Sequence, residues 1–94
     1  MSWRITLTSD KKIEEQEVIE ALYSMPANFR SYCGLNKEHG FSWLIGSDII
    51  NPTFNYLVLS VSSRKNEGDE LAVATFIKQE LEEEYGHTID IRLN

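Results

Sequence analysis

The sequence predicts an α+β fold with the element order β-α-β-β-α-β. Two segments alternate apolar and polar residues, as half-buried strands do, two more apolar segments are typical of strands, and two longer segments repeat apolar residues at the helical period. Pro, Gly and Asn stand between several of these segments, where turns are expected. The length of 94 residues and the hydrophobic fraction of 41% fit one domain, residues 1–94, with a core of its own.

The first half of the chain predicts a strand followed by a helix. Residues 3–8 (WRITLT) alternate in the manner of a strand. We expect Ser9 or Asp10 to cap a helix over residues 11–25, because either side chain can accept a hydrogen bond from a free backbone N–H. Pro26 is expected to end this helix, since the residue before a proline avoids the α region.

The second half predicts a pair of strands, a long helix and a last strand. Pro52 lies in a turn signal between the two strands, since proline favours a turn position. Asn66 is a suitable N-cap for the helix, and Gly86 is a suitable C-cap. The expected elements are strands over residues 41–45, 54–61 and 87–93 and a helix over residues 67–85.

This element order favours a four-stranded antiparallel sheet with both helices on one face. The arrangement is called ferredoxin-like, and right-handed crossover connections favour it for this order of strands and helices. It hosts many unrelated functions, so the function has to be argued from individual residues.

The acidic residues are concentrated in the second helix. The net charge is −6, and residues 67–85 hold seven acids and one lysine, while the rest of the chain has eight acids and eight bases. Three of these acids crowd the last turn, where the carbonyl end of the helix dipole disfavours anions by about 0.3–1 kcal/mol each. They indicate either a docking surface for a basic partner or a solvated face balanced by Arg30 or Arg92.

Phe76 is the second unusual feature of this helix. On a helical wheel it points away from the apolar face, whose members include Leu71, and it lies among polar residues. An aromatic ring in that position indicates an interface anchor, unless the segment 26–40 folds over it. The predicted partner-binding residues are Phe76, Gln79, Glu80, Glu82, Glu83 and Glu84.

The sheet predicts a second candidate surface on the side away from the helices. If the apolar residues of the first and third strands face the helices, then Leu44, Tyr56 and Val58 face outward. Such a small apolar group commonly becomes buried through self-association. It therefore indicates a possible homodimer.

Residues 26–40 show no sustained period, so we expect a long loop there, with a short helical turn over residues 28–33 as the alternative. Cys33 and His39 share this segment, and a Cys–His pair is one way to activate a nucleophile. No local signature surrounds them. His87, just after the second helix, is expected to be a surface residue that complements the helix dipole.

Other functional classes have little support in the sequence. The negative charge and the lack of a basic cluster argue against nucleic acid and anionic membranes as partners. The chain has no metal-ligand spacing, no phosphate-binding glycine loop and no apolar run that could span a membrane, so we expect no metal, no cofactor and no enzyme. The absence of a signal region and the single cysteine predict a cytoplasmic protein.

We therefore expect a small acidic domain that binds a larger basic protein and inhibits or modulates it. A nucleic-acid-handling enzyme or a toxin would be a fitting partner, as it is for immunity proteins and phage-encoded inhibitors, which share only small size and acidity with this chain. Glu80, Glu83 and Glu84 around Phe76 would occupy a surface meant for phosphates. The alternative is a homodimeric accessory domain without catalysis.

Overall fold

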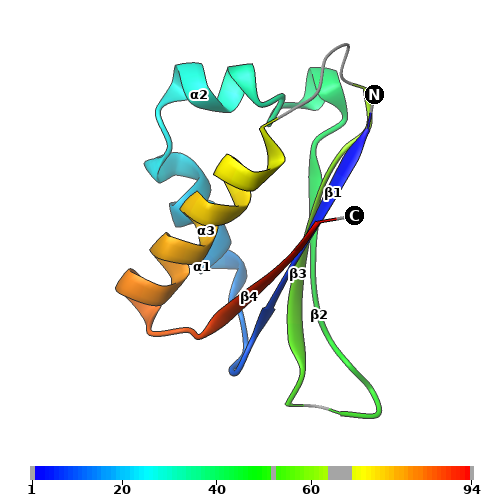
Figure 1. Ribbon diagram of the computed structural model, residues 1–94, viewed down its shortest axis with the longest axis vertical. Helices are drawn as coiled ribbons and strands as arrows, with labels where there is room; N and C mark the ends of the chain where they lie inside the picture. Colours follow the sequence, from blue (N-terminus) through cyan, green and yellow to red (C-terminus); the bar gives the residue numbers. More distant parts are fainter. Residues whose placement is uncertain (1, 52, 64–68, 94) are drawn as a thin grey trace.

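The computed structural model describes residues 2–51, 53–63 and 69–93. These residues form a four-stranded antiparallel sheet and three α-helices, which is an α+β fold. The helices lie together on one side of the sheet and leave its other side open (Figure 1).

The strands follow the alternation of the sequence closely. They are β1 (Trp3–Ser9), β2 (Ser42–Ser47), β3 (Asn55–Val61) and β4 (Ile89–Leu93). Their order in the sheet is β2-β3-β1-β4, and every neighbouring pair is antiparallel. Buried and half-buried residues alternate along the whole of β3, because its apolar residues point toward the helices and the others point toward the open face.

The first helix starts later than the sequence predicts. α1 spans Glu15–Ser24, and its N-cap is Glu14 rather than Ser9 or Asp10. Ser9 instead pairs across the sheet as the last residue of β1. The cap is a reciprocal box, in which the backbone N–H of Glu14 donates to Oε1 of Glu17 at 3.0 Å. The helix ends before Pro26, as expected, with Met25 as its C-cap.

The segment expected as a long loop contains further helical structure. α2 spans Ala27–Tyr32, which agrees with the alternative of a short helical turn, and a 3₁₀ turn, η1, spans Lys37–His39. Two glycines end these elements with positive φ, namely Gly34 at 76° and Gly40 at 68°. The connection is therefore ordered by backbone hydrogen bonds over most of its length.

The long helix, α3, spans Glu70–Tyr85 and begins after Asp69, its N-cap. Asn66, the expected cap, and Pro52, in the expected turn, lie outside the described residues. Gly86 is the C-cap with φ of 71°, as predicted. The last strand begins at Ile89 instead of residue 87, because His87 lies in the connection from the helix.

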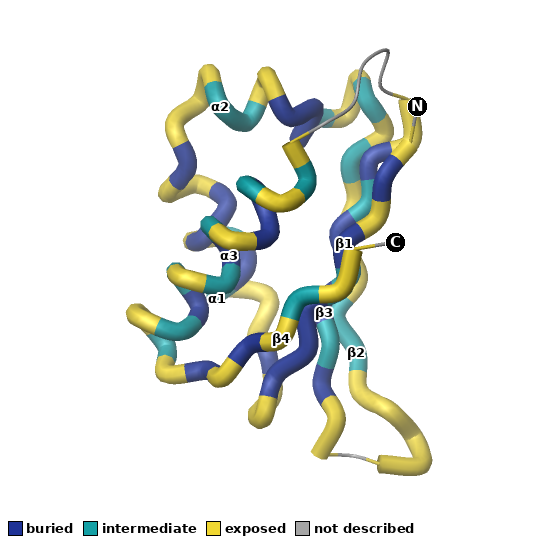
Figure 2. The backbone as a smooth tube through the Cα atoms, in the orientation of Figure 1, coloured by how far each residue is buried: buried dark blue, intermediate teal, exposed yellow. Residues whose placement is uncertain are grey.

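The core lies between the helix layer and the sheet, where Figure 2 shows the buried positions facing each other. Ile5 is paired with Leu59, and Leu7 with Leu57, so the central strands present an apolar face to the helices. The helices cover this face with fully buried side chains. These are Val18 and Ala21 from α1 and Val73, Ala74, Ile77 and Leu81 from α3.

Candidate functional site

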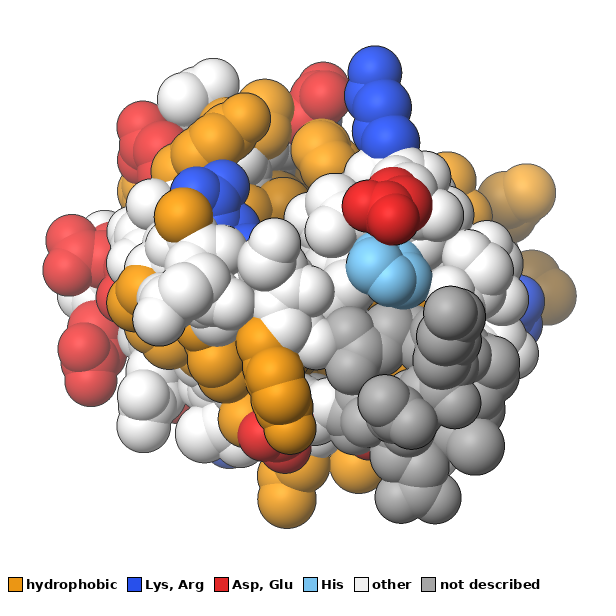
Figure 3. Space-filling model, turned by 90° about the horizontal axis from the view of Figure 1, so that it is seen from above, with side chains coloured by type: hydrophobic (Ala, Val, Ile, Leu, Met, Phe, Trp, Pro, Cys, Tyr) orange, Lys and Arg blue, Asp and Glu red, His pale blue; other side chains and the backbone are white. Residues whose placement is uncertain are grey.

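The negative charge gathers at one end of the helix layer, which we call the acidic end. The end of α3 and the middle of α1 meet here, because the Tyr85 hydroxyl at the end of α3 donates to Glu20 of α1. α1 adds three glutamates and no base to the glutamates of α3. Figure 3 shows acidic side chains gathered at the left edge, which is the side of the helix layer. The sequence predicts this surface on one helix, whereas two helices form it.

The three glutamates of the last turn of α3 have different roles. Glu82 is half-buried, and its carboxylate accepts the backbone N–H of Ile89 at 3.0 Å, which holds the start of β4. Glu83 and Glu84 are exposed and have no hydrogen bond or ion pair with any residue that the structure describes. Only these two carboxylates are therefore left for an external partner.

A lysine, rather than either of the expected arginines, balances the carbonyl end of α3. The ammonium group of Lys11 donates to the main-chain carbonyl of Tyr85. Arg30 instead stacks on the ring of Tyr23, with its guanidinium carbon 5.0 Å from the ring centroid. Lys11 precedes α1 in the chain, so only the folded structure brings it to the end of α3.

Phe76 does not point freely into solvent as the helical wheel predicts. It is half-buried and packs against the hydrophobic core. Leu71, which the wheel placed on the core face, is 60% exposed. α3 packs against α1 as well as against β1 and β4. Its buried face is therefore wider than a helical wheel with one buried face assumes, and it is centred on different residues. The exposed stripe of α3 contains Leu71, Thr75, Gln79 and Glu83, while Glu80 is half-buried.

A buried polar cluster lies beside the acidic end. His87 is 4% exposed, which contradicts its expected surface position. Its Nδ1 lies 2.6 Å from Oγ of Ser9, and its Nε2 lies 2.9 Å from Oε1 of Glu17. The cluster thereby joins β1, α1 and the connection between α3 and β4. No local pattern could reveal it, because Ser9 lies 78 residues from His87 in the chain.

Asp10 extends this cluster to the backbone. Its carboxylate accepts the N–H of Thr88 at 3.0 Å, and this hydrogen bond is the main cause that holds the pKa of Asp10 below its ordinary value of 3.8. The Ser9 hydroxyl and the nearby His87 lower the pKa in the same direction, while burial opposes them. A depressed pKa means that the folded state favours the charged form of Asp10. Its contribution to stability is therefore present above pH 3.8 and is lost as the pH falls through the folded-state pKa.

The order Ser–His–Glu has the hydrogen-bond pattern of an activated serine, but the position of Ser9 does not suit catalysis. Ser9 is 7% exposed, and its Oγ also accepts the backbone N–H of Lys11 at 3.2 Å. Three surface hollows, on the open face of the sheet, at the β2–β3 hairpin and between α1, α2 and β2, are lined by other residues. We therefore interpret the cluster as a structural link.

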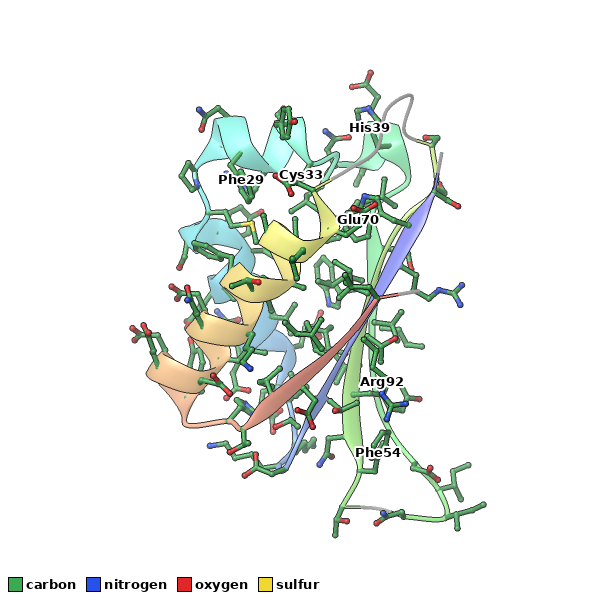
Figure 4. The ribbon with its side chains drawn as sticks, viewed as in Figure 1. Phe29, Cys33, His39, Phe54, Glu70 and Arg92 are labelled. Atoms are coloured by element: carbon green, nitrogen blue, oxygen red, sulfur yellow. The ribbon has the colours of Figure 1, made fainter. Side chains whose placement is uncertain are left out.

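Cys33 and His39 do not form an accessible pair. Cys33 follows α2 and is completely buried, so its thiol cannot meet a substrate in this conformation. His39 belongs to η1, and its Nδ1 contacts Oδ1 of Asn36 at 2.8 Å. Figure 4 shows the two residues on these separate elements.

The open face of the sheet carries the second predicted surface. The register aligns Leu44 with Val58, and Gly46 with Tyr56, on the side away from the helices. Leu44 is 61% exposed, whereas Tyr56 and Val58 are half-buried. The side chain of Tyr56 covers Gly46, since a Cβ added there would lie 2.9 Å from its ring carbon Cε2. A hollow of about 370 Å³ adjoins this group and is lined by Arg4, Thr6, Ser42, Trp43, Leu44, Val58 and Ser60.

The sequence analysis missed one exposed apolar feature, at the end of the β2–β3 hairpin. Ile49 is 98% exposed and Ile50 is 94% exposed. The carboxylate of Asp48 accepts the N–H groups of Ile50 at 2.8 Å and of Asn51 at 3.3 Å, which fixes the start of the turn. The hairpin extends beyond the rest of the sheet in Figure 1, so it presents both isoleucines to solvent.

Membrane spans, metal sites and known relatives were each looked for. Among the described residues, no helix combines the length and apolar character needed to cross a membrane. In the same part of the chain, no group of three or more His, Cys, Asp or Glu side chains is placed to hold a metal ion. Comparisons with protein families, curated proteins and solved structures found no match to this chain.

Proposed function

We propose that this chain is a protein-binding domain that docks on a basic partner protein through its acidic end and inhibits or modulates that partner. The observation that carries the proposal is the pair Glu83 and Glu84 in the last turn of α3. Both are exposed and unpaired among the described residues, in a position where the helix dipole disfavours anions. Folding therefore gains nothing from them, which favours a role outside the folded chain.

The glutamates of α1 strengthen the field at this end. Glu20 is exposed and accepts the hydroxyl of Tyr85 at the end of α3, and Glu15 is exposed in the first turn of the same helix. The ion pair of Lys12 with Glu14 just before α1, at 3.9 Å, has side chains that are 77% and 60% exposed, so it is weak and strongly solvated. A concentrated negative field of this kind accelerates the encounter with a basic protein and orients it.

The structure changes which predicted residues suit the contact. Glu83, Glu84 and Gln79 are exposed, and Leu71 on the same helix offers an apolar contact. Glu82 is held by Ile89 and is better assigned to the fold. Phe76 and Glu80 are half-buried, so they would contribute at the margin of the contact rather than at its centre.

The test is an affinity capture with the protein as bait in a lysate of its native host, followed by washing at low and then high salt. We expect a basic protein that is released by salt and is lost when the bait carries E83K and E84K. A matched bait with E38K and D90K changes the net charge equally at exposed residues of η1 and β4. If both baits lose the protein equally, the attraction depends on net charge alone and the proposed surface is wrong.

A measured affinity gives the decisive result once the partner is purified. The double reversal at Glu83 and Glu84 should weaken binding by roughly tenfold or more and reduce its dependence on salt. The control reversal at Glu38 and Asp90 should leave most of the affinity. Unchanged binding by the first variant would contradict the proposal.

The open sheet face supports a second candidate function, self-association as a homodimer. Leu44 is 61% exposed in a row with Val58, and the helices that the structure describes lie on the other side of the sheet (Figure 1). The change L44E places a charge in that row at a position the fold does not bury. A dimer that uses this face should become a monomer in sedimentation experiments, and an unchanged dimer would exclude the face.

We also infer that the domain has the ferredoxin-like arrangement. The order β2-β3-β1-β4, the antiparallel pairing and the helices on one side support this assignment. The fold itself does not select either function. We place the partner encounter in the cytoplasm, since the single cysteine is a buried thiol that forms no disulfide.

A further inference from the structure

A pocket of about 240 Å³ lies away from the acidic end, between α1, α2, η1 and β2. It exists because β2 is an edge strand whose helix side is incompletely covered. Trp43 and its register partner Leu59 lie on the same side of the sheet, yet Trp43 is 36% exposed and Leu59 is 0% exposed. The apolar walls come from Ile19, Leu22, Leu35, Phe41 and Trp43.

The polar part of the pocket is basic. Arg30 and Lys37 line it, and no acidic side chain does. Lys37 is exposed at η1, while Arg30 is half-buried and lies over the ring of Tyr23. Figure 3, which looks toward the α2 end, shows basic side chains beside hydrophobic ones there.

Arg30 is the unusual residue of this pocket. Its Nε is buried and has no hydrogen-bond acceptor, and its guanidinium forms no ion pair with the residues that the structure describes. Buried donors in folded proteins nearly always have an acceptor, so the described residues leave the hydrogen-bonding capacity of Arg30 incompletely satisfied. Asn36 does not supply the acceptor, since its Oδ1 already contacts the backbone N–H and Nδ1 of His39.

We propose that this pocket binds a small organic carboxylate with an apolar body. The carboxylate would accept hydrogen bonds from Arg30 and would be attracted by the ammonium group of Lys37. The apolar part of the ligand would lie against Phe41 and Trp43. The volume of about 240 Å³ lies below the roughly 300–1,000 Å³ of common ligand pockets, which suits a single ring or a short branched chain.

The same features exclude other classes of small ligand. A neutral apolar molecule would leave the charges of Arg30 and Lys37 in the lining without an anionic partner, and a cation would be repelled by both groups. The net charge of −6 repels anions from the molecule as a whole. Binding of a carboxylate therefore depends on the local geometry at Arg30, because a planar guanidinium is suited to a carboxylate.

The test is a titration of the ¹⁵N-labelled protein with phenylpropionate, followed by amide chemical shifts. We expect saturable shifts in residues 19–23, 30–37 and 41–43. The neutral phenylpropanamide and the cationic phenylpropylamine have the same apolar body and should bind at least tenfold more weakly. A branched aliphatic carboxylate, isocaproate, serves as a second probe of the same class.

Variants separate the pocket from its surroundings. R30Q should weaken the binding of phenylpropionate by roughly tenfold to a hundredfold. R30K should recover only part of the affinity, because lysine keeps the charge but lacks the planar guanidinium that donates two parallel hydrogen bonds to a carboxylate. R92Q is the matched control, since it removes an arginine from the opposite, open side of the sheet. The partner-surface variant with E83K and E84K should keep its affinity for phenylpropionate, so failure of one proposal is distinguishable from failure of the other.

Three results would overturn the inference. The first is the absence of saturable shifts with both carboxylates, and the second is equal binding of phenylpropionate and its amide. The third is an R30Q variant that keeps the wild-type amide spectrum and binds phenylpropionate as tightly as R92Q. The comparison of carboxylate with amide uses the unaltered protein, so the test does not depend on whether R30Q folds.

Discussion

The buried histidine makes a quantitative prediction about stability. His87 → Ala removes two side-chain hydrogen bonds, to Ser9 and to Glu17, and leaves a gap at a residue that is 4% exposed. Each hydrogen bond contributes about 1 kcal/mol, and the loss of a buried ring adds a cavity cost of on the order of 1–2 kcal/mol. We expect the free energy of unfolding to fall by about 3–4 kcal/mol, a large part of the ~5–15 kcal/mol typical of a folded protein.

The chain contains its own matched control for this change. His39 is half-buried, and its ring contacts only Asn36, three residues away, among the described hydrogen bonds. His39 → Ala should therefore cost about 1 kcal/mol or less. Urea unfolding can be followed by fluorescence of the buried Trp3 and by circular dichroism. Equal losses in the two variants would refute the structural role of His87.

A double-mutant cycle tests the link itself. Ser9 → Ala alone removes the acceptor or donor opposite Nδ1 of His87, and the combined variant removes both partners. If the 2.6 Å contact stabilises the fold, the two losses should be non-additive by more than about 0.5 kcal/mol. Simple additivity would mean that His87 acts only by filling space.

Three further predictions concern single sites. Gly46 → Ala should lower the free energy of unfolding by about 1 kcal/mol, because the new Cβ would meet the ring of Tyr56. This loss should disappear in a Tyr56 → Ala background, and urea unfolding of the single and double variants measures it. Glu82 → Ala should lower the free energy of unfolding by about 1 kcal/mol, because it removes the hydrogen bond to the first amide of β4. Glu83 → Ala should be neutral or slightly stabilising. Thermal unfolding that ranks the two variants in the reverse order would be inconsistent with the structure. Asp10 → Asn should remove the part of the stability that wild type loses as the pH falls below 3.8, so unfolding curves from neutral to acid pH should converge at the acid end.

Features set by neighbouring residues could be predicted from the sequence. The alternation in residues 3–8 and 87–93 indicates two of the strands, since side-chain period and burial are linked within each strand. Gly86 is recognised as a C-cap because the requirement for a positive φ is local. The open-face placement of Leu44 follows from the same alternation once the sheet is assumed.

Features that depend on distant partners could not be predicted in this way. His87 and Glu17 are 70 residues apart, so nothing near either residue indicates their contact. Phe76 was misplaced because a wheel assigns one buried face, while α3 packs on both α1 and the sheet. Arg30 looked like a balancing charge for the acidic helix, and only the structure shows its Nε buried at a pocket.

The acidic helix illustrates how a structure separates charge required by the fold from charge that is not. Lys11 and Gly86 satisfy carbonyl groups at the end of α3, and Glu82 holds the following strand. With these contacts made, Glu83 and Glu84 can be changed without breaking any interaction among the described residues. Substitutions at these two residues should therefore alter partner binding with little change in stability. A partner affinity that fell only in proportion to the free energy of unfolding would show that the acidic end has no binding role of its own.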